Sequence, residues 1–282
     1  MMKANTFIVG APKAGTTSLH YYLSQHHDVC MSSLKEPNFF SFEEVSSLFY
    51  KATSISNSTA YHKLFDEEKK VIGEASVSYL FYENVPKRIF EYNSKSNIVI
   101  LLRHPVDRAI SHYLMDYRLG YCSCTLEEIV NNKDKYPLFF QQYVELGLYY
   151  KQVKRYLDTF GRERVHILFY SDFKNDTEGA IRDLFHFLKL ENTSVDFSVQ
   201  NSFMKPTNAV VSYLYSLSWV RKGIKNIIPT KAVEAVKRRF FSKQNKPDFA
   251  DSLMAQLSAY YLPDITRLES LLNVNLTSWK NN

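Results

Sequence analysis

The chain has 282 residues, of which 45% are apolar and 15% aromatic, and its formal net charge is +6. A chain of this length with so many large side chains can bury one large or two small cores, which excludes global disorder. It contains only 8 glycines, so collagen-like and low-complexity chains are excluded as well.

Four short apolar runs predict buried strands, because they are rich in Val and Ile and do not alternate with polar residues. Helical periodicity lies between and after them. The predicted strands cover residues 6–9, 71–74, 97–102 and 164–170, and the predicted helices cover 17–26, 109–118, 148–160 and 177–190. Strands that alternate with helices favour a parallel sheet with helices on both faces. We expect an α/β fold in one domain over residues 1–282, with a helical, basic C-terminal portion.

The loop after the first predicted strand has the features of an anion site. It reads Gly10-Ala11-Pro12-Lys13-Ala14-Gly15-Thr16-Thr17-Ser18. Free backbone amides and the positive end of the helix dipole point into such a turn, and Lys13 adds a full charge. Gly10 and Gly15 have the spacing of the nucleotide-triphosphatase P-loop, G-x-x-x-x-G-K-[ST], but Thr16 stands where that motif has lysine. The sequence therefore predicts a P-loop-like sheet edge whose lysine lies inside the loop.

A second candidate site follows the strand predicted at 97–102. Arg103 comes directly after this strand, and Ser111 comes eight residues later in a predicted helix. The carboxyl end of a strand is where open α/β sheets bind ligands, and a guanidinium can bind a phosphate through two parallel hydrogen bonds. Arg103 is expected to bind phosphate, and an ion pair with Asp107 or Glu74 is the purely structural alternative.

The most basic part of the chain is the segment 205–246, which has ten basic residues and one acidic residue, a local charge of +9. Such a segment favours an anionic partner, and a solvated helical face is the equal alternative. No run approaches the roughly 20 apolar residues of a membrane span, and residues 1–9 lack a cleavable hydrophobic segment. Three cysteines are too few for a disulfide framework. We expect a cytoplasmic protein without a transmembrane segment.

Residues 12–19 resemble the 5′-phosphosulfate loop of sulfotransferases that use 3′-phosphoadenosine 5′-phosphosulfate (PAPS). Arg103 and Ser111 are similar to the 3′-phosphate motif of that family. Lys35-Glu36-Pro37-Asn38-Phe39-Phe40 resembles a Lys-Glu-x-x-Phe-Phe segment of its heparan-sulfate-type and bacterial carbohydrate branch. Residues 73–79 resemble Gly-Glu-x-Ser-Pro-x-Tyr, with Val77 in place of the proline and Ala75 where some members carry a lysine.

This resemblance implies PAPS as the sulfuryl donor, the desulfated nucleotide PAP as the product, and no metal. It implies that Lys13 stabilises the leaving group and that Glu36 is the general base, with His104 or His112 as the alternative bases. The residues that it implies in cofactor binding are Lys13, Ala14, Gly15, Thr16, Thr17, Ser18, Arg103 and Ser111. Arg221-Lys222-Gly223 is similar to a 3′-phosphate contact of cytosolic sulfotransferases, and it fits a basic surface equally well.

The sequence thus predicts an enzyme that transfers a sulfuryl group from PAPS to a hydroxyl, less readily to an amine, of a glycan or glycoconjugate. The basic segment suits an acidic or lipid-linked acceptor and leaves peripheral membrane contact open, while nucleic acid is not expected as a partner. One alternative is a P-loop kinase for a small metabolite, which needs a lysine directly after Gly15. The other is a non-catalytic basic binding module, which needs neither Lys13 nor the pair Arg103 and Ser111.

Overall fold

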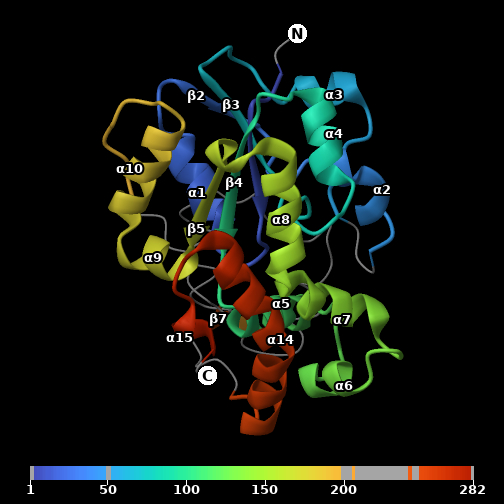
Figure 1. Ribbon diagram of the computed structural model, residues 1–282. Helices are drawn as coiled ribbons and strands as arrows, with labels where there is room; N and C mark the ends of the chain where they lie inside the picture. Colours follow the sequence, from blue (N-terminus) through green and yellow to red (C-terminus); the bar gives the residue numbers. More distant parts are fainter. Residues whose placement is uncertain (1–2, 49–51, 198–204, 207–240, 243–247, 281–282) are drawn as a thin grey trace.

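The computed structural model describes residues 3–48, 52–197, 205–206, 241–242 and 248–280. A five-stranded sheet lies at its centre, with helices on both faces (Figure 1). The strands are β1 (Thr6–Gly10), β2 (Val29–Met31), β3 (Val71–Ala75), β4 (Asn97–Leu102) and β5 (Val165–Phe169). All neighbouring strands pair in parallel, in the order β2-β3-β1-β4-β5. The predicted α/β fold is confirmed, and β2 is a strand that the sequence analysis missed.

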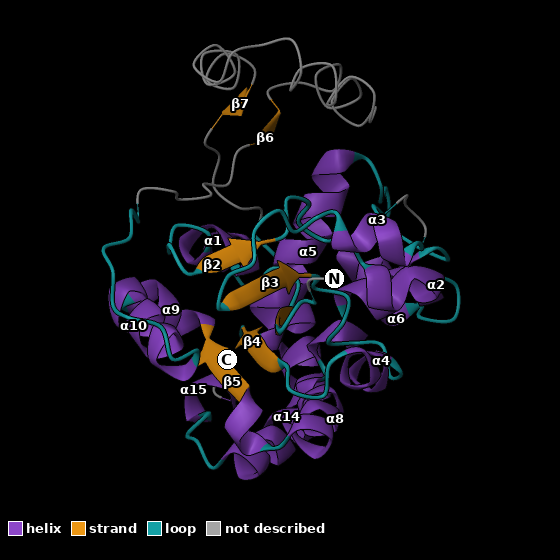
Figure 2. Cartoon of the chain, turned by 90° about the horizontal axis from the view of Figure 1, so that it is seen from above, coloured by secondary structure: helices purple, strands orange, loops and turns teal. Residues whose placement is uncertain are grey.

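Two groups of helices cover the sheet, as the view from above makes clear (Figure 2). One face carries α1 (Thr16–Leu23), α9 (Tyr170–Asn175) and α10 (Thr177–Phe187), and the other carries α4 (Val85–Tyr92) and α8 (Tyr149–Phe160). The four predicted helices correspond to α1, α8, α10 and α5 (Pro105–Leu119). Shorter elements complete the chain up to residue 187: α2 (Phe42–Val45), α3 (Ser58–His62), α6 (Leu126–Asn131), α7 (Pro137–Tyr143), and the 3-10 turns η1 (Phe39–Ser41), η2 (Glu145–Gly147) and η3 (Arg162–Arg164).

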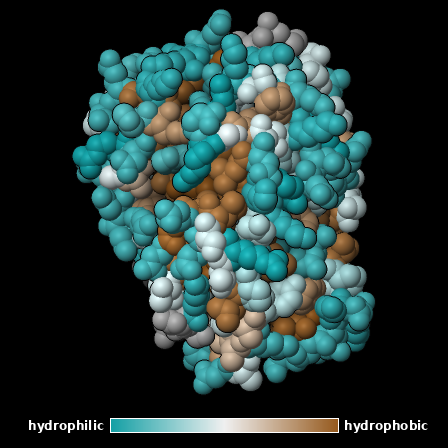
Figure 3. Space-filling model, viewed as in Figure 1, coloured by the Kyte–Doolittle hydropathy of each residue, from teal (hydrophilic) through white to brown (hydrophobic). Residues whose placement is uncertain are grey.

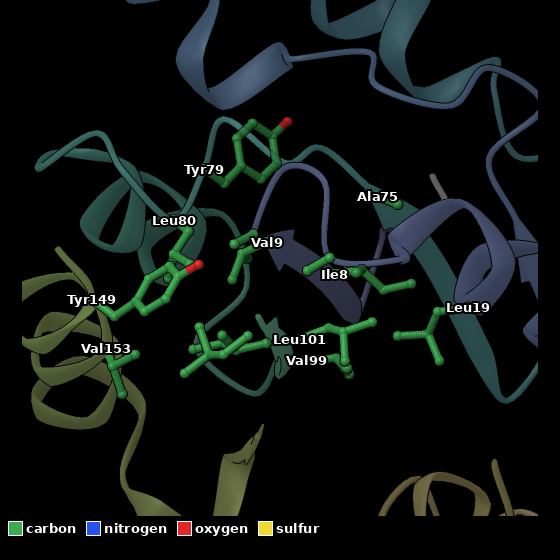
Figure 4. Packing of buried hydrophobic residues seen from close by; sticks show 14 of the residues in the cluster. Ile8, Val9, Leu19, Ala75, Tyr79, Leu80, Val99, Leu101, Tyr149 and Val153 are labelled. Atoms are coloured by element: carbon green, nitrogen blue, oxygen red, sulfur yellow. The ribbon is translucent and has the colours of Figure 1, made fainter. Parts of the chain in front are cut away.

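The core lies on both sides of the central strands. Every residue of β1 and β3 is buried, and so is every residue of β4 after the first. Figure 4 shows Ile8 and Val9 of β1 between Leu19 of α1 and the side chains of Tyr149 and Val153 of α8. Strands that are covered on both faces have no polar alternation, which is why the contiguous apolar runs identified them. On the face drawn in Figure 3 most of the surface is hydrophilic, and apolar residues gather near its centre.

The C-terminal part of the described chain is helical, as predicted. Helix α14 (Asp251–Leu272) packs against α8 and α5, and α15 (Thr277–Lys280) follows it. Of the basic segment 205–246, the structure describes only Lys205–Pro206 (β6) and Phe241–Ser242 (β7), which pair antiparallel. Arg221, Lys222 and Gly223 therefore lie outside the described residues. No helix in the described part of the chain is both long enough and apolar enough to cross a membrane.

Candidate active site

A cavity of about 960 Å³ lies at the carboxyl edge of the sheet. Because all five strands are parallel, the segment that leaves each strand arrives at this same edge. All five segments line the cavity: Pro12, Lys13 and residues 15–18 follow β1, Lys35 and Glu36 follow β2, Val77 and Ser78 follow β3, Arg103 follows β4, and Tyr170 follows β5. The fold thus brings together the motifs that are far apart in the sequence.

The loop between β1 and α1 is a tight turn that ends at Gly15. This glycine has φ of +99°, a backbone conformation that favours glycine, and its Cα faces the ring of Tyr170. The amide of Ala11 donates to the carbonyl of Leu101 at 2.7 Å, which ties the loop to β4. Helix α1 begins at Thr16; the amides of Ser18 and Leu19 donate to the carbonyl of Gly15 at 3.0 and 3.2 Å, and those of Thr16 and Thr17 precede the first helical hydrogen bond. The loop therefore presents donors to the cavity.

Lys13 carries the positive charge of this loop. Its Nζ donates to the thioether sulfur of Met115 at 3.1 Å, and no other described residue accepts a hydrogen bond from it. Burial lowers the pKa of Lys13 to about 8, helped by the charges of Arg118 and Arg103 and opposed by those of Asp116 and Glu36. The ammonium is still charged at pH 7. It has no strong acceptor among the described residues, which suits it to an incoming anion.

Arg103 lies beside the loop with its side chain 13% exposed. One guanidinium nitrogen donates to the carbonyl of Lys13 at 3.1 Å, and the guanidinium lies 4.9 Å from the centre of the Tyr170 ring. Asp107 is 4.0 Å away and mostly exposed, so it is a weak partner. The carboxylate of Glu74 accepts from Tyr61 and Ser76 instead. The remaining guanidinium donors are thus available to a phosphate.

Tyr22, Phe173 and Phe197 line the same cavity as Tyr170, the ring that lies beside Arg103. The rings of Tyr22 and Phe197 are 5.1 Å apart, and those of Tyr22 and Phe173 are 6.2 Å apart. Such faces suit the stacking of a flat base. The cavity therefore has a cationic and aromatic end around Arg103, which we call the nucleotide end.

Glu36 lines the cavity on the loop that follows β2. Its Oε1 lies 2.5 Å from Nζ of Lys35, and its side chain is 40% exposed. The backbone of Glu36 has φ of +60°, and its amide donates to the carbonyl of Ala75 at 2.9 Å. Ala75 itself is fully buried, so the cation beside Glu36 comes from Lys35 rather than from β3.

Asn38 holds the Glu36 loop in place, a role that the sequence analysis missed. Its Nδ2 donates to the carbonyls of Glu36 and Thr53 at 3.1 and 2.8 Å. Its Oδ1 accepts from the hydroxyl of Ser78 at 2.6 Å, and its amide donates to the hydroxyl of Ser76 at 3.1 Å. Asn38 is 5% exposed and has φ of +48°. These bonds fix the backbone from which Glu36 reaches the cavity.

Helix α5 contributes a stripe of residues to the cavity: Ser111, His112, Met115, Asp116 and Leu119. The spacing of the stripe is that of one helical face. Asp116 is 1% exposed, and its Oδ2 accepts from the hydroxyl of Tyr143 at 3.0 Å. Burial raises the pKa of Asp116 to about 6, although the Tyr143 hydrogen bond and the charge of Lys13 act in the opposite direction. The sequence analysis did not identify this carboxylate.

His104 and His112, the alternative general bases to Glu36, lie in different places. His112 lines the cavity, but burial and the nearby charges of Arg108 and Lys13 hold its pKa well below the usual value. His104 is not part of the cavity lining, and its Nε2 contacts the carbonyl of Trp279 at 3.3 Å.

Eight of the nine residues in the predicted site line this cavity: Lys13, Gly15, Thr16, Thr17, Ser18, Glu36, Arg103 and Ser111. The ninth, Ala14, does not line it. Ala14 is fully buried, and its amide donates to the carbonyl of Ala11 at 3.3 Å, which closes the turn of the loop.

Within the described residues, one group of three potential metal ligands lies close together, namely His26, His27 and Asp28. Both ring nitrogens of His26 are engaged, Nε2 with the carbonyl of Glu191 at 2.9 Å and Nδ1 with the amide of Asp28 at 3.0 Å. These residues are outside the cavity lining. The prediction that transfer needs no metal stays a prediction.

Comparisons with known proteins show which family this chain belongs to. The sequence matches the family model described as a sulfotransferase domain over residues 3–264. It is 32% identical over 109 residues to the membrane-associated sulfotransferase kil1 of Dictyostelium discoideum, which covers 39% of this chain and 22% of that protein. It is 23% identical over 250 residues to human carbohydrate sulfotransferase 15, which covers 65% of this chain and 43% of that protein. The chain thus spans less than half the length of both curated relatives.

Among solved structures, a sulfotransferase from Alicyclobacillus acidocaldarius matches with a TM-score of 0.77 and 30% identity over 100% of both chains. The resemblance and the P-loop-like fold drawn from the sequence are therefore confirmed. Since the family model covers nearly the whole chain, this protein belongs to the sulfotransferase family.

Proposed function

We propose that this protein is an enzyme that transfers the sulfuryl group of PAPS to a hydroxyl of a glycan or glycoconjugate. The observation that carries the proposal is the single cavity shared by the Lys13 loop, the pair Arg103 and Ser111, and Glu36. A module that only binds anions would not need a carboxylate placed opposite the cationic loop. A small-metabolite kinase would need a lysine after Gly15, where this chain has Thr16.

The residues at the nucleotide end fit PAPS. Arg103 and Ser111 would hold the 3′-phosphate, because an arginine with available donors and a hydroxyl can bind its oxygens together. The aromatic residues around Tyr170 would stack with the adenine. Lys13, the loop amides and the hydroxyls of Thr16, Thr17 and Ser18 would surround the 5′-phosphosulfate. Ala14 would contribute only by closing the turn.

PAPS, when bound, supplies the sulfuryl group and a phosphate leaving group. The chain's own task is to stabilise the negative charge that develops on the leaving phosphate, and preorganised donors do this without reorganisation. Lys13 is the strongest of these donors because its ammonium is buried and lacks a strong acceptor among the described residues. Glu36 would accept the proton of the attacking hydroxyl, a contribution of roughly 10²–10⁴ in rate. Lys35 would orient this carboxylate at 2.5 Å.

The acceptor class rests on the relatives. One relative is named a carbohydrate sulfotransferase, and this name supports a glycan acceptor for the present chain. The prediction of an acidic or lipid-linked acceptor was based on the charge of the segment 205–246, and it stays a prediction. The cytoplasmic location, the single domain over 1–282 and the independence from metal also stay predictions.

Calorimetric titration without Mg²⁺ tests the proposal. PAP and adenosine 5′-phosphate would each be titrated into the wild type, Arg103→Ala and Lys13→Ala. We expect the wild type to bind PAP at least ~10-fold more tightly than adenosine 5′-phosphate, and we expect Arg103→Ala to abolish that difference, because the guanidinium pairs with the 3′-phosphate. Equal binding of both nucleotides by the wild type would remove PAPS as the donor and return the kinase to consideration.

A further inference from the structure

Helix α5 extends from the nucleotide end of the cavity past Lys13. Ser111 lies toward Arg103, Met115 contacts the ammonium of Lys13 at 3.1 Å, and Asp116 and Leu119 lie further along the same face. From Ser111 to Leu119 the helix rises about 12 Å. If the donor phosphates occupy the Ser111 and Lys13 levels, the stretch of cavity at Asp116 and Leu119 is left for the acceptor. We call this stretch the acceptor end.

Within the described residues, one carboxylate oxygen of Asp116 accepts a hydrogen bond and the other does not. Oδ2 accepts from the Tyr143 hydroxyl at 3.0 Å and lies 4.0 Å from Nε2 of His112. Oδ1 is buried and has no hydrogen-bond partner in the part of the chain that the structure describes. An unsatisfied buried acceptor is costly and rare in native proteins, so each one requires an explanation. A donor group on a bound ligand would satisfy it.

The surroundings restrict the chemistry of that ligand. Met115, Leu119 and Leu146 give this part of the lining an apolar character. The charged groups of the described lining are Lys13, Lys35, Glu36, Arg103, Asp116 and Lys174, and Lys35 is already paired with Glu36 at 2.5 Å. An anion placed against Asp116 would meet a like charge, while Lys13, the cation of this lining whose charge reaches Asp116, is assigned to the donor phosphate. A hydroxyl or an ammonium would instead form a charge-assisted hydrogen bond.

We propose that Oδ1 of Asp116 is an acceptor-substrate subsite that binds a hydroxyl or ammonium group next to the position that is sulfated. The inference rests on the proposed function, because it names the substrate chemistry of the same cavity. Tyr143 is a positioning residue in this scheme, since its hydroxyl holds Oδ2 and leaves Oδ1 directed to the ligand. Asp116 selects acceptors with a donor at this point and rejects a carboxylate or sulfate there.

Binding and transfer together test the subsite. The proteins would be the wild type, Asp116→Asn, and Tyr143→Phe, which keeps the Asp116 carboxylate but removes the hydrogen bond that positions it. PAP affinity would be measured first by calorimetry. Transfer of labelled sulfate from PAPS would then be measured with 4-nitrophenyl glucoside and two analogues that differ only at C6, the 6-amino-6-deoxyglucoside and the glucuronide. These three probes present a hydroxyl, an ammonium and a carboxylate on one scaffold.

We expect all three proteins to bind PAP within about threefold of one another. The wild type should use the hydroxyl and ammonium glycosides with kcat/KM at least ~10-fold above that for the glucuronide. Asp116→Asn should lose roughly 10- to 100-fold on those two acceptors, mostly through KM, and should lose the preference against the glucuronide. Tyr143→Phe should keep the direction of the preference, because the carboxylate is still present, but it should raise KM for those two acceptors, because Oδ2 is no longer held by the Tyr143 hydroxyl.

Other outcomes overturn the subsite. If Asp116→Asn weakens PAP binding tenfold or more and keeps the wild-type acceptor preference, Asp116 serves Lys13 as a counter-ion. If the glucuronide is used as well as the glucoside, or none of the three is sulfated while PAP binds tightly, the subsite does not take this class of ligand. If the wild type fails to bind PAP, it is the proposed function that fails, which is a different result.

Discussion

The ammonium of Lys13 and the thioether of Met115 meet at 3.1 Å, although the residues are 102 positions apart in the sequence. A thioether is a weak hydrogen-bond acceptor, so it can steady the lysine without competing with an anion for its charge. The contact joins the loop after β1 to the middle of α5. It places the cation between the nucleotide end of the cavity and the acceptor end.

Replacing Lys13 and Met115 one at a time should distinguish the effect of the lysine charge on kcat from the effect of packing around it. Lys13→Ala is expected to lower kcat by about 10²–10³ because it removes a preorganised donor from the leaving phosphate. Met115→Leu preserves the volume but not the sulfur, and it should change kcat by less than about threefold. Single-turnover transfer from labelled PAPS measures both. A large loss in Met115→Leu together with a small loss in Lys13→Ala would contradict this assignment.

The pKa of Lys13, lowered to about 8 by burial, predicts a pH dependence of nucleotide binding. An anionic ligand favours the protonated form, so affinity is full well below pH 8 and falls as pH rises through this value. Between pH 7 and pH 9 the affinity for PAP should fall about tenfold. Lys13→Ala should show little change over this range, where the phosphates of PAP stay ionised. Calorimetry at both pH values checks the result, and an equally steep fall in Lys13→Ala would assign it elsewhere.

Asn38 should affect catalysis without touching the nucleotide. Asn38→Ala removes the hydrogen bonds to the carbonyls of Glu36 and Thr53 and is expected to lower kcat at least ~10-fold, because the base loses its fixed backbone. PAP affinity should stay within about twofold. Ser78→Ala removes the bond to Oδ1 of Asn38 and the bond between the Ser78 and Ser41 hydroxyls, but it leaves both Nδ2 bonds of Asn38 intact and should have a smaller effect on kcat. The idea is wrong if Asn38→Ala weakens PAP binding as much as it lowers kcat.

The buried carboxyl group of Glu74 should make the free energy of unfolding depend on pH. It is fully buried, and burial raises its pKa to about 7 against the hydrogen bonds from Tyr79, Ser76 and Tyr61. Between the ordinary carboxyl pKa and about 7 the folded state holds a proton that the unfolded state has released, so this group's contribution to stability falls as pH rises through that window.

Glu74→Gln removes this titration. Its unfolding free energy relative to wild type should therefore rise by up to a few kcal/mol between pH 5 and pH 8. Urea unfolding at the two pH values measures the difference. Glu68→Gln, at an exposed position, is the matched control and should show no such trend. A constant difference between wild type and Glu74→Gln at both pH values would show that Glu74 is ionised throughout.

The sequence analysis located the elements with the strongest local signals. Strands β1, β3 and β4 were found because strands buried on both faces leave unbroken apolar runs. Strand β5 has a similar apolar run, although most of its residues are only partly buried. Strand β2 was missed because it has only three residues, Val29–Met31, which is too short for a periodicity to be visible. Its position matters, since it delivers Lys35 and Glu36 to the cavity.

Within the site, motifs predicted residues that line the cavity, such as Lys13, Gly15 and Arg103. Asp116 has no motif, and a single carboxylate in a helix usually faces water. The available signal was its spacing of four residues from His112, which places both on one helical face. Ala14 shows the opposite error, since a place inside the motif did not mean a place on the cavity wall.

Helix α5 also fixes a distance within the cavity. Asp116 lies about 7.5 Å from Ser111 along the helix axis, because the helix rises by a constant amount per residue. One extra residue between them would turn Asp116 about 100° out of the cavity while Arg103 and Ser111 kept their places. Under the proposed function, the residue spacing along this helix, as much as any side chain, would therefore set which position of the acceptor lies beside Lys13.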